Sequence, residues 1–152
     1  MAKRETIIIG ADHGGWELKN FIAKGLSREL DIVDVSSPHK DKHDDTLPIT
    51  QRLVRICLSE QVFGLLICTS GVGVAMEANK YKGIRAVLAE DERIIRMSRE
   101  HNDANVLCLP SFIDPYSALH FIELFKETKF LALERYIRRN HDLDSLGEEV
   151  IL

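Results

Sequence analysis

The sequence predicts an α/β fold built on about five parallel strands. Short apolar runs of strand length alternate along the chain with segments in which apolar residues recur at helical spacing. The runs contain few polar residues, as expected for strands that helices cover on both faces. No Pro/Ser-rich linker or repeat interrupts the alternation, which is typical of a doubly wound parallel sheet.

Composition limits the classes of function. The chain is 45% hydrophobic and 29% charged, which is ordinary for one globular domain covering residues 1–152. A net charge of −4 gives no general basic field for nucleic acid. The longest apolar runs are too short to cross a bilayer, and the first five residues lack the apolar stretch of a signal peptide. We therefore expect a cytoplasmic protein that binds neither a membrane nor nucleic acid.

The elements are expected in alternating order. The apolar run at 5–10 predicts the first strand, and the amphipathic segment at 15–30 predicts the first helix. The later strands are expected at 31–35, 63–68, 83–89 and 105–109, and the helices that follow them at 47–59, 74–80, 91–101 and 114–128. A last amphipathic helix is expected at 131–140, and its position depends on what it packs against.

Ligands of open parallel sheets bind at the carboxyl ends of the strands, near the point where the strand order reverses. The loops expected there contain Asp12 and His13 after the first strand and residues 36–48 after the second. Residues 68–73, Glu90 and residues 110–114 follow the other three strands. The loop with Asp12 and His13 and the loop at 68–73 carry the clearest chemistry.

The segment from Phe63 to Gly73 is the most informative part of the chain. An apolar strand ends in Cys68 and opens into the small-residue turn Thr69-Ser-Gly-Val-Gly73. The N–H groups of such a turn and of the helix after it favour an oxyanion or a phosphate, and Thr69 and Ser70 add hydroxyls. The same surroundings favour the reactive thiolate form of Cys68. The turn matches neither the Walker loop nor the dinucleotide-binding fingerprint.

The cysteines are three in number and have no CxxC spacing, so the sequence indicates neither a disulfide framework nor a zinc site. Cys57 falls in an expected helix and Cys108 in an expected strand, and both fit packing roles. Cys68 is equally compatible with packing and with chemistry when it is judged by position alone. A thiol-redox role is less favoured, because no resolving cysteine lies nearby in sequence.

Two polar positions allow both structural and functional interpretations. Asp12 either caps the next helix or binds a ligand together with the adjacent His13. His101 lies near the end of an expected helix, where a histidine often only interacts with the helix dipole. Residues 39–45 are rich in Lys, His and Asp and are interpreted as a solvated loop, because their spacing matches no metal motif.

Arginines recur in the last expected helix, at positions 135, 138 and 139. Such a charge run is most often a solvated face. Arg135 and Arg139 stand four residues apart, however, so both guanidinium groups leave the same face of the helix. Two such groups could bind one phosphate bidentately.

Several motifs occur together and in order: Gly10-Ala-Asp-His-Gly-Gly-Trp-Glu-Leu-Lys19, Ile67-Cys-Thr-Ser-Gly-Val-Gly73, Ala78-Asn-Lys80, Gly83-Ile-Arg-Ala-Val87 and Ser98-Arg-Glu-His-Asn-Asp-Ala-Asn-Val-Leu107. With them the chain resembles the ribose-5-phosphate isomerase B family, which includes the galactose-6-phosphate isomerase subunits, over about residues 7–139. The resemblance implies a Rossmann-like three-layer α/β/α sandwich, formed by a single sugar-phosphate isomerase domain with a C-terminal helical tail. It also implies homodimers, sometimes tetramers, with active sites shared between subunits and with no metal or cofactor.

The resemblance also implies roles for individual residues. Family members interconvert aldose and ketose phosphates, so Cys68 would move a proton between C1 and C2 through an enediolate, while Ser70 and His101 assist ring opening. Contacts to the enediolate, the hydroxyls and the phosphate are implied for Asp12, His13, Thr69, Gly71, Val72, Gly73, Asn102, Arg135 and Arg139. Ribose 5-phosphate is the default substrate, and another tetrose, pentose or hexose phosphate stays possible.

The chain departs from the family pattern at recognition positions. The usual Cys-Gly-Thr-Gly is Cys68-Thr-Ser-Gly71, and the usual Asp-Tyr-Pro is Asp45-Thr-Leu-Pro48 without the tyrosine. The usual Gly-x-Arg after the fifth strand is Pro110-Ser-Phe112, and the usual Glu-Gly-Gly before Arg135 is Leu131-Ala-Leu-Glu134, with one extra residue. Two alternatives therefore stay open, a subunit that needs a paralogous partner and a sugar-phosphate-binding protein without turnover. Retention of the cysteine, the histidine and both arginines favours an enzyme.

Overall fold

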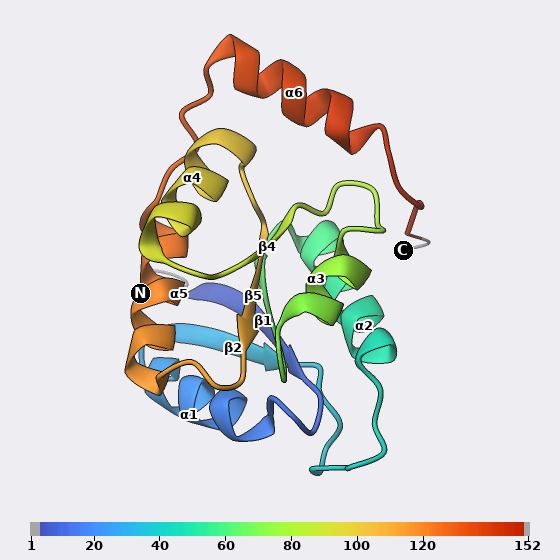
Figure 1. Cartoon of the computed structure of the whole chain (residues 1–152), viewed down its shortest axis with the longest axis vertical. Coiled ribbons are helices and arrows are strands. Elements are labelled where there is room, and N and C mark those ends of the chain that lie inside the picture. The colour runs from blue at the N-terminus through green and yellow to red at the C-terminus, as the bar shows by residue number, and fades with distance from the viewer. Residues whose placement is uncertain (1–3, 151–152) are drawn as a thin grey trace.

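A five-stranded parallel sheet lies at the centre of the computed structural model, which describes residues 4–150 (Figure 1). The strands are β1 (Glu5–Ala11), β2 (Leu30–Asp34), β3 (Phe63–Cys68), β4 (Ala86–Leu88) and β5 (Val106–Pro110). Their order across the sheet is β2-β1-β3-β5-β4, and every neighbouring pair is parallel. The order reverses between β1 and β3, because β2 lies on one side of this pair and β4 and β5 lie on the other. The predicted fold class is confirmed.

Helices cover both faces of the sheet. On one face, α1 (Trp16–Leu26) and α4 (Glu92–Asn102) both pack against α5 (Pro115–Glu127), while α2 (Thr46–Glu60) packs against α3 (Val72–Ala78) on the other (Figure 1). The last helix, α6 (Glu134–Asp144), contacts α4 and lies across one end of the molecule. No helix within residues 4–150 combines the length and the apolar character needed to cross a membrane.

The two faces of each central strand supply separate apolar cores. Ile7 and Ile9 of β1 join Leu65 and Ile67 of β3 in the core beneath α1, α4 and α5, whereas Ile8 faces the opposite core beneath α2 and α3. All five side chains are buried. A parallel strand that is buried on both faces appears in the sequence as a continuous apolar run, which explains why these strands were predictable.

Some predicted boundaries were wrong. Helix α1 ends at Leu26 instead of continuing to residue 30, because Leu30 already belongs to β2 and pairs with Glu5. Strand β4 covers only three of the seven residues predicted at 83–89. Gly83 adopts φ +82°, and the Asn79 amide both donates to the carbonyl of Ala86 and accepts from its N–H. These contacts shorten the edge strand and occupy polar groups that an open edge would otherwise expose.

Helix α6 also differs from its prediction. It begins three residues later than the expected start at 131 and continues to Asp144 instead of ending at 140. Beyond it, the Glu148 N–H donates to the carbonyl of Lys80, and the carbonyl of Glu148 accepts from the N–H of Lys82. The segment after the helix is therefore held against the loop that precedes β4.

Candidate active site

Cys68 is the last residue of β3, and a tight turn follows it. Gly71 adopts φ +74°, and its N–H donates a 3.2 Å hydrogen bond to Cys68 Sγ. A Cβ at position 71 would lie 2.9 Å from the carbonyl carbon of Leu109, so both the backbone conformation and the space require glycine. Because the turn is so tight, α3 begins at Val72, two residues earlier than predicted.

The surroundings of Cys68 suit a negatively charged sulfur. A backbone N–H donor stabilises a thiolate, and the first N–H groups of a helix have no partner within that helix. Cys68 is 7% exposed and lies at the carboxyl end of β3 within the apolar core beneath α2 and α3, so the thiol is shielded from bulk water. The turn therefore combines a sulfur with hydrogen-bond donors at the strand end predicted to bind a ligand.

The other two cysteines lie in the core, as predicted. Burial raises the pKa of Cys57 to about 12. Burial also raises the pKa of Cys108, and the nearby Cys68 and Glu77 add to the shift. Neither thiol ionises near neutral pH, so their settings differ from that of a catalytic thiolate.

The two hydroxyl residues after Cys68 are exposed at the carboxyl ends of the strands, which we call the carboxyl edge of the sheet. Ser70 Oγ accepts a 3.3 Å hydrogen bond from the N–H of Val72, which leaves its own hydrogen available to a substrate oxygen. Thr69 packs against the loop after β1, since a Cβ at Gly14 would lie 2.5 Å from Thr69 Oγ1. The bulkier Thr69 thus meets a glycine, and the loops after β1 and β3 are in contact.

Asp12 and His13 stand beside that contact. Asp12 Oδ1 accepts the N–H of Gly15 at 3.1 Å, a bond within the turn before α1, whereas the N-cap of that helix is Gly15 and no side chain caps it. Asp44 Oδ1 accepts the His13 backbone N–H at 3.0 Å and lies 2.8 Å from His13 Nδ1. The hydrogen bond to Asp44 raises the pKa of His13, against the opposing effect of burial, and the charges of Asp12, Asp44 and Asp41 add to the increase.

Asp44 is a residue that sequence reasoning missed, because residues 39–45 were interpreted as a solvated loop. Its side chain is only 7% exposed. The available signal was its place after β2, since β2 and β1 are neighbours and the loops that follow them meet at one edge. Ligand atoms of Asp12, His13 and Asp44 lie within 4.8 Å of one another, a spacing that would also suit a metal ion. Each of these side chains, however, already has a protein partner.

His101 and Asn102 lie at the amino ends of the strands, which we call the amino edge of the sheet. A helix that connects parallel strands starts at their carboxyl ends and returns to their amino ends, and the 11 residues of α4 span about 16 Å. His101 and Asn102 are at the end of this helix, close to the beginning of β5 (Figure 1). Within one chain, the structure therefore does not bring them to the Cys68 turn.

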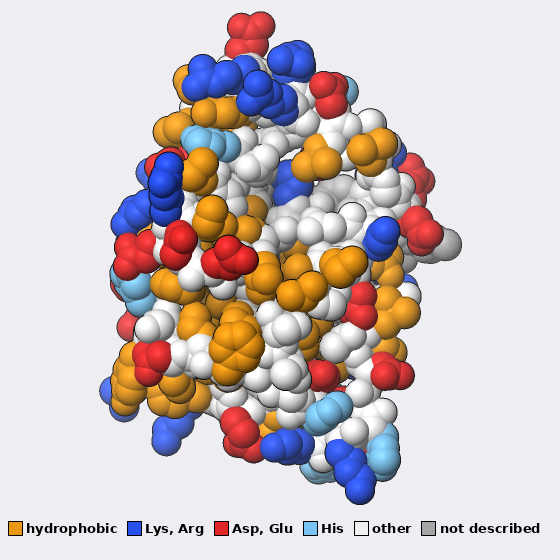
Figure 2. Space-filling view, in the orientation of Figure 1, with side chains coloured by type: hydrophobic (Ala, Val, Ile, Leu, Met, Phe, Trp, Pro, Cys, Tyr) orange, Lys and Arg blue, Asp and Glu red, His pale blue; other side chains and the backbone are white. Residues whose placement is uncertain are grey.

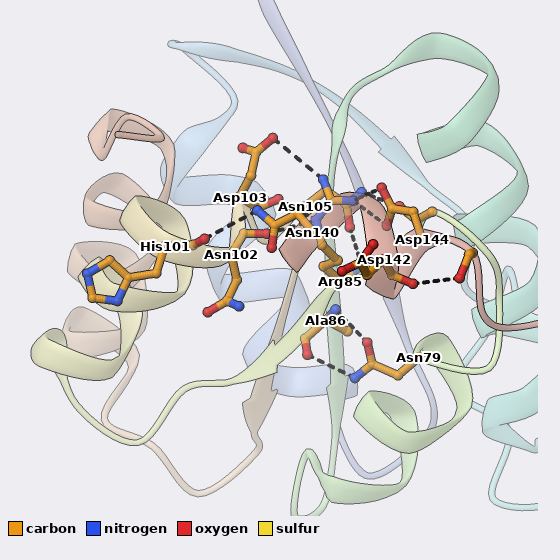
Figure 3. Close-up of polar contacts among 12 residues, drawn as sticks. Asn79, Arg85, Ala86, His101, Asn102, Asp103, Asn105, Asn140, Asp142 and Asp144 are labelled. Carbon is orange, nitrogen blue, oxygen red and sulfur yellow. Dashed lines mark hydrogen bonds and ion pairs between the residues drawn. The ribbon is translucent and has the colours of Figure 1, made fainter. Parts of the chain in front are cut away.

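Helix α6 places Tyr136, Arg135 and Asn140 near His101. The His101 ring stacks on Tyr136 with 4.6 Å between ring centroids, and Arg135 lies over the same Tyr136 ring. Asn140 donates a 3.2 Å hydrogen bond to the carbonyl of His101. The side chains of Arg135 and Arg139 are exposed. Figure 3 shows that the His101 imidazole points away from the neighbouring polar network.

Arg85 holds the far end of α6. Its Nη1 donates to both carboxylate oxygens of Asp144, at 2.7 and 2.8 Å, and its Nε donates to the carbonyl of Asn102 at 2.8 Å (Figure 3). Asp103 adds a longer contact of 3.5 Å to the same guanidinium. Sequence reasoning gave Arg85 no role, although it stands in one of the quoted motifs. We call Arg85, Asn140 and Asp144 the α6 clamp.

The structure thus divides the twelve predicted site residues into two groups. The carboxyl-edge group is Asp12, His13, Cys68, Thr69, Ser70, Gly71, Val72 and Gly73. The amino-edge group is His101, Asn102, Arg135 and Arg139. A cavity of about 450 Å³ adjoins the second group and is lined by Asn102, Arg85, Asn79, Tyr81, Leu143 and Leu146 among others.

Comparisons with known proteins agree on one family. The family model described as Ribose/Galactose Isomerase matches residues 7–143. The chain is 37% identical over 133 residues to the probable ribose-5-phosphate isomerase B of Mycoplasma pneumoniae, covering 86% of this chain and 88% of that protein. It is 38% identical over 135 residues to the galactose-6-phosphate isomerase subunit LacA of Streptococcus agalactiae, covering 88% and 94% of the two chains.

Solved structures give the same result. A ribose 5-phosphate isomerase from Thermotoga maritima matches with a TM-score of 0.88 and 31% identity, over 95% of this chain and all of that one. The ribose-5-phosphate isomerase B of Mycoplasma genitalium with bound ribulose-5-phosphate matches with a TM-score of 0.86 and 30% identity, over 95% and 97% of the chains. The chain therefore belongs to the ribose/galactose isomerase family and is a sugar-phosphate aldose–ketose isomerase.

Proposed function

We propose that this enzyme interconverts ribose 5-phosphate and ribulose 5-phosphate, with Cys68 as the base that moves the proton. The observation that carries the proposal is the Cys68 turn, in which a shielded thiol receives a backbone hydrogen bond beside Asp12 and His13. The bound ribulose-5-phosphate in the Mycoplasma genitalium relative supports a pentose phosphate as the substrate.

The chemistry requires one proton to change carbon atoms. The Cys68 thiolate removes the proton from C2 of the open-chain aldose, and the electron pair of that bond forms the enediol double bond, leaving negative charge on O1. The thiol then returns the proton to C1, and the hydrogen of O2 passes to O1, so that a hydroxyl forms at C1 and the ketose carbonyl at C2. The N–H of Gly71 donates to the sulfur, and the N–H groups of Val72 and Gly73 follow at the start of α3, where such donors stabilise charge that develops only during the reaction.

Substrate binding requires groups from both edges of the sheet. Two arginines on one face of α6 suit a phosphate, and His101 with Ser70 suits proton transfer during ring opening. Because these groups lie at opposite edges in one chain, we propose that a second copy completes each site. Cys68 of one copy would then work with His101 and Arg139 of the partner subunit.

The surface beside β4 supports this assembly. Figure 2 shows hydrophobic side chains gathered over the middle of the face where β4, α3 and α4 lie, with basic side chains above them over α6. Val72 and Met76 of α3 and Ile94 and Met97 of α4 are exposed apolar residues, and Met76 is 64% exposed. A two-fold axis perpendicular to the strands at the β4 edge would turn the strands of the two copies antiparallel. The carboxyl edge of one copy would thereby face the amino edge of the other.

A substrate panel tests the proposal. Tetrose, pentose and hexose phosphates are assayed with the wild-type enzyme and with Cys68→Ser, and we expect ribose 5-phosphate to have the highest kcat/KM with the wild type. Cys68→Ser should lose turnover of every substrate while it still binds them. Full activity in Cys68→Ser would reject the thiol as the base, and preference for a hexose phosphate would reject the pentose assignment.

A second candidate is a subunit of a two-component hexose-phosphate isomerase. It is favoured by the LacA relative, which is a subunit of galactose-6-phosphate isomerase, and by Phe112, which is 78% exposed where family members commonly carry an arginine. Turnover of galactose 6-phosphate only after mixing with a paralogous chain would identify this case. Turnover of ribose 5-phosphate by the purified chain alone would exclude it.

A further inference from the structure

Asp44 and His13 form a pair in which the carboxylate determines the orientation of the imidazole and which ring nitrogen carries a hydrogen. Asp44 Oδ1 accepts the backbone N–H of His13 and bonds its Nδ1, so the loop after β2 fixes both the backbone and the ring of His13. A ring nitrogen that faces a carboxylate carries the hydrogen. The other nitrogen, Nε2, is then left for a ligand, and the His13 side chain is 41% exposed.

The environment of Asp44 favours a cationic His13. The side chain of Asp44 is 7% exposed, and its Oδ2 is buried without a hydrogen-bond partner among residues 4–150. A buried carboxylate with one unpaired oxygen is costly unless a positive charge lies close to it. The Nδ1 of His13 is 2.8 Å from Oδ1 and supplies that charge when the ring is protonated.

We propose that Asp44 is a positioning residue of the isomerase, which holds His13 as a cationic Nε2–H donor aimed at an acceptor oxygen of the sugar phosphate. The inference rests on the proposed function, because it assigns His13 to substrate binding. Asp44 itself contacts no substrate in this account and acts only through His13. The acceptor is either the phosphate or a sugar hydroxyl, which share the same hydrogen-bonding chemistry.

The pH dependence follows from the groups around His13. Asp12 from the loop after β1 and Asp41 and Asp44 from the loop after β2 all raise the pKa of His13, and the hydrogen bond to Asp44 has the largest effect. The cationic form therefore persists above pH 6.5, which is about the ordinary histidine pKa. Substrate affinity should fall as the pH rises through the raised pKa of His13. Without the charge of Asp44, this fall should begin at lower pH.

The test compares Asp44→Asn with Asp45→Asn. Asparagine keeps the shape and an acceptor oxygen at position 44 but removes the charge, while Asp45 is exposed and makes no side-chain cap of α2. At pH 8 we expect KM to rise roughly tenfold in Asp44→Asn, with kcat within about twofold of the wild type. The rise of KM with pH should shift to lower pH in Asp44→Asn and stay in place in Asp45→Asn.

A second readout is independent of turnover. NMR titration of the His13 imidazole, assigned with His13→Gln, should give a lower pKa in Asp44→Asn than in the wild type. If the wild type turns over no sugar phosphate, the proposed function is rejected. The titration still tests whether Asp44 raises the pKa of His13. The inference would be overturned if the wild-type enzyme is active and Asp44→Asn shows the same dependence of KM on pH and the same His13 pKa as the wild type.

Inhibition by inorganic phosphate distinguishes the two acceptors. If His13 contacts the phosphate, the inhibition constant should rise in Asp44→Asn together with KM. If His13 contacts a hydroxyl, KM should rise while the inhibition constant stays at the wild-type value. Both outcomes support a positioning role for Asp44, and an unchanged KM contradicts it.

Discussion

The two edges of the sheet hold their functional groups by different means. At the carboxyl edge, a tight backbone turn fixes Cys68 and its hydrogen-bond donor. This turn requires glycine at position 71. At the amino edge, Arg135 and Arg139 are presented by α6, which a few side-chain contacts attach to the body. The comparison indicates that the proposed proton-transfer group is held rigidly by the backbone, whereas the proposed recognition groups depend on a helix that single substitutions can loosen.

The largest effect is expected at the carboxyl edge. Cys68→Ala should lower kcat by about 10³-fold, because the carbon acid loses its positioned base. The melting temperature should fall slightly, to about the same extent as in Cys57→Ala, since both cysteines are buried in the apolar core beneath α2 and α3. Steady-state kinetics and thermal unfolding measure the two quantities.

Cys57→Ala is the matched control for this change. Cys57 belongs to α2 and is buried in the core, and its removal should cost about 1 kcal/mol of unfolding free energy while kcat is retained. Wild-type kcat in Cys68→Ala, or an equal loss of kcat in Cys57→Ala, would remove the distinction between the catalytic and the packing cysteine.

The next largest effect is expected on α6. Arg139→Ala should raise KM by roughly tenfold or more, because the proposed charge-assisted contact to the phosphate would be lost. Arg138→Ala is the control, since Arg138 is also exposed on α6 and its nearest carboxylate is Asp142 at 4.0 Å. Equal KM values for the two variants would mean that this part of α6 is a solvated face only.

A smaller effect is expected from the α6 clamp. Asp144→Asn weakens the charged contact with Arg85, so the end of α6 should loosen and KM should rise by about threefold with kcat retained. Amide hydrogen exchange in α6 should become faster. Asp142→Asn, in the same helix but outside the clamp, should change neither quantity, and a similar change in both variants would contradict the role of the clamp.

The smallest effect is expected from metal removal. Asp12, His13 and Asp44 already have protein hydrogen-bond partners, so incubation with a chelator should leave kcat and KM unchanged. Loss of activity that a divalent cation restores would show that these side chains act as metal ligands. Such a result would contradict the cationic state proposed for His13, because its imidazole would then bind a metal ion.

Sequence patterns predicted the fold well because its physical determinants are local. Strands buried on both faces appear as apolar runs such as Ile7 to Ile9, and the strand end at Cys68 is followed at once by its glycine turn. The shortened β4 was not predictable in the same way. It depends on Asn79, whose amide hydrogen bonds cross seven residues of sequence to Ala86.

The site was predicted less completely than the fold. Asp44 lies 31 residues from His13 in sequence, and nothing in a stretch rich in Lys, His and Asp singles it out before the loops are folded together. The separation of His101 from Cys68 follows from the direction of α4, which becomes a constraint only once the sheet is known to be parallel. Motif order alone does not reveal that separation.

The most direct test of a site built from both edges is complementation between two impaired variants, assayed at a substrate concentration well below KM, where Arg139→Ala also loses most of its activity. Cys68→Ala and Arg139→Ala are co-expressed, so that mixed dimers carry one intact site and one doubly altered site. For random assembly, about a quarter of the sites should be intact, and activity should recover to about that fraction of the wild type. Co-expression of Cys68→Ala with Ser70→Ala, both at the carboxyl edge, should give no recovery. Failure of the first pair to recover activity, in mixed dimers verified by mass, would contradict an active site shared between two copies.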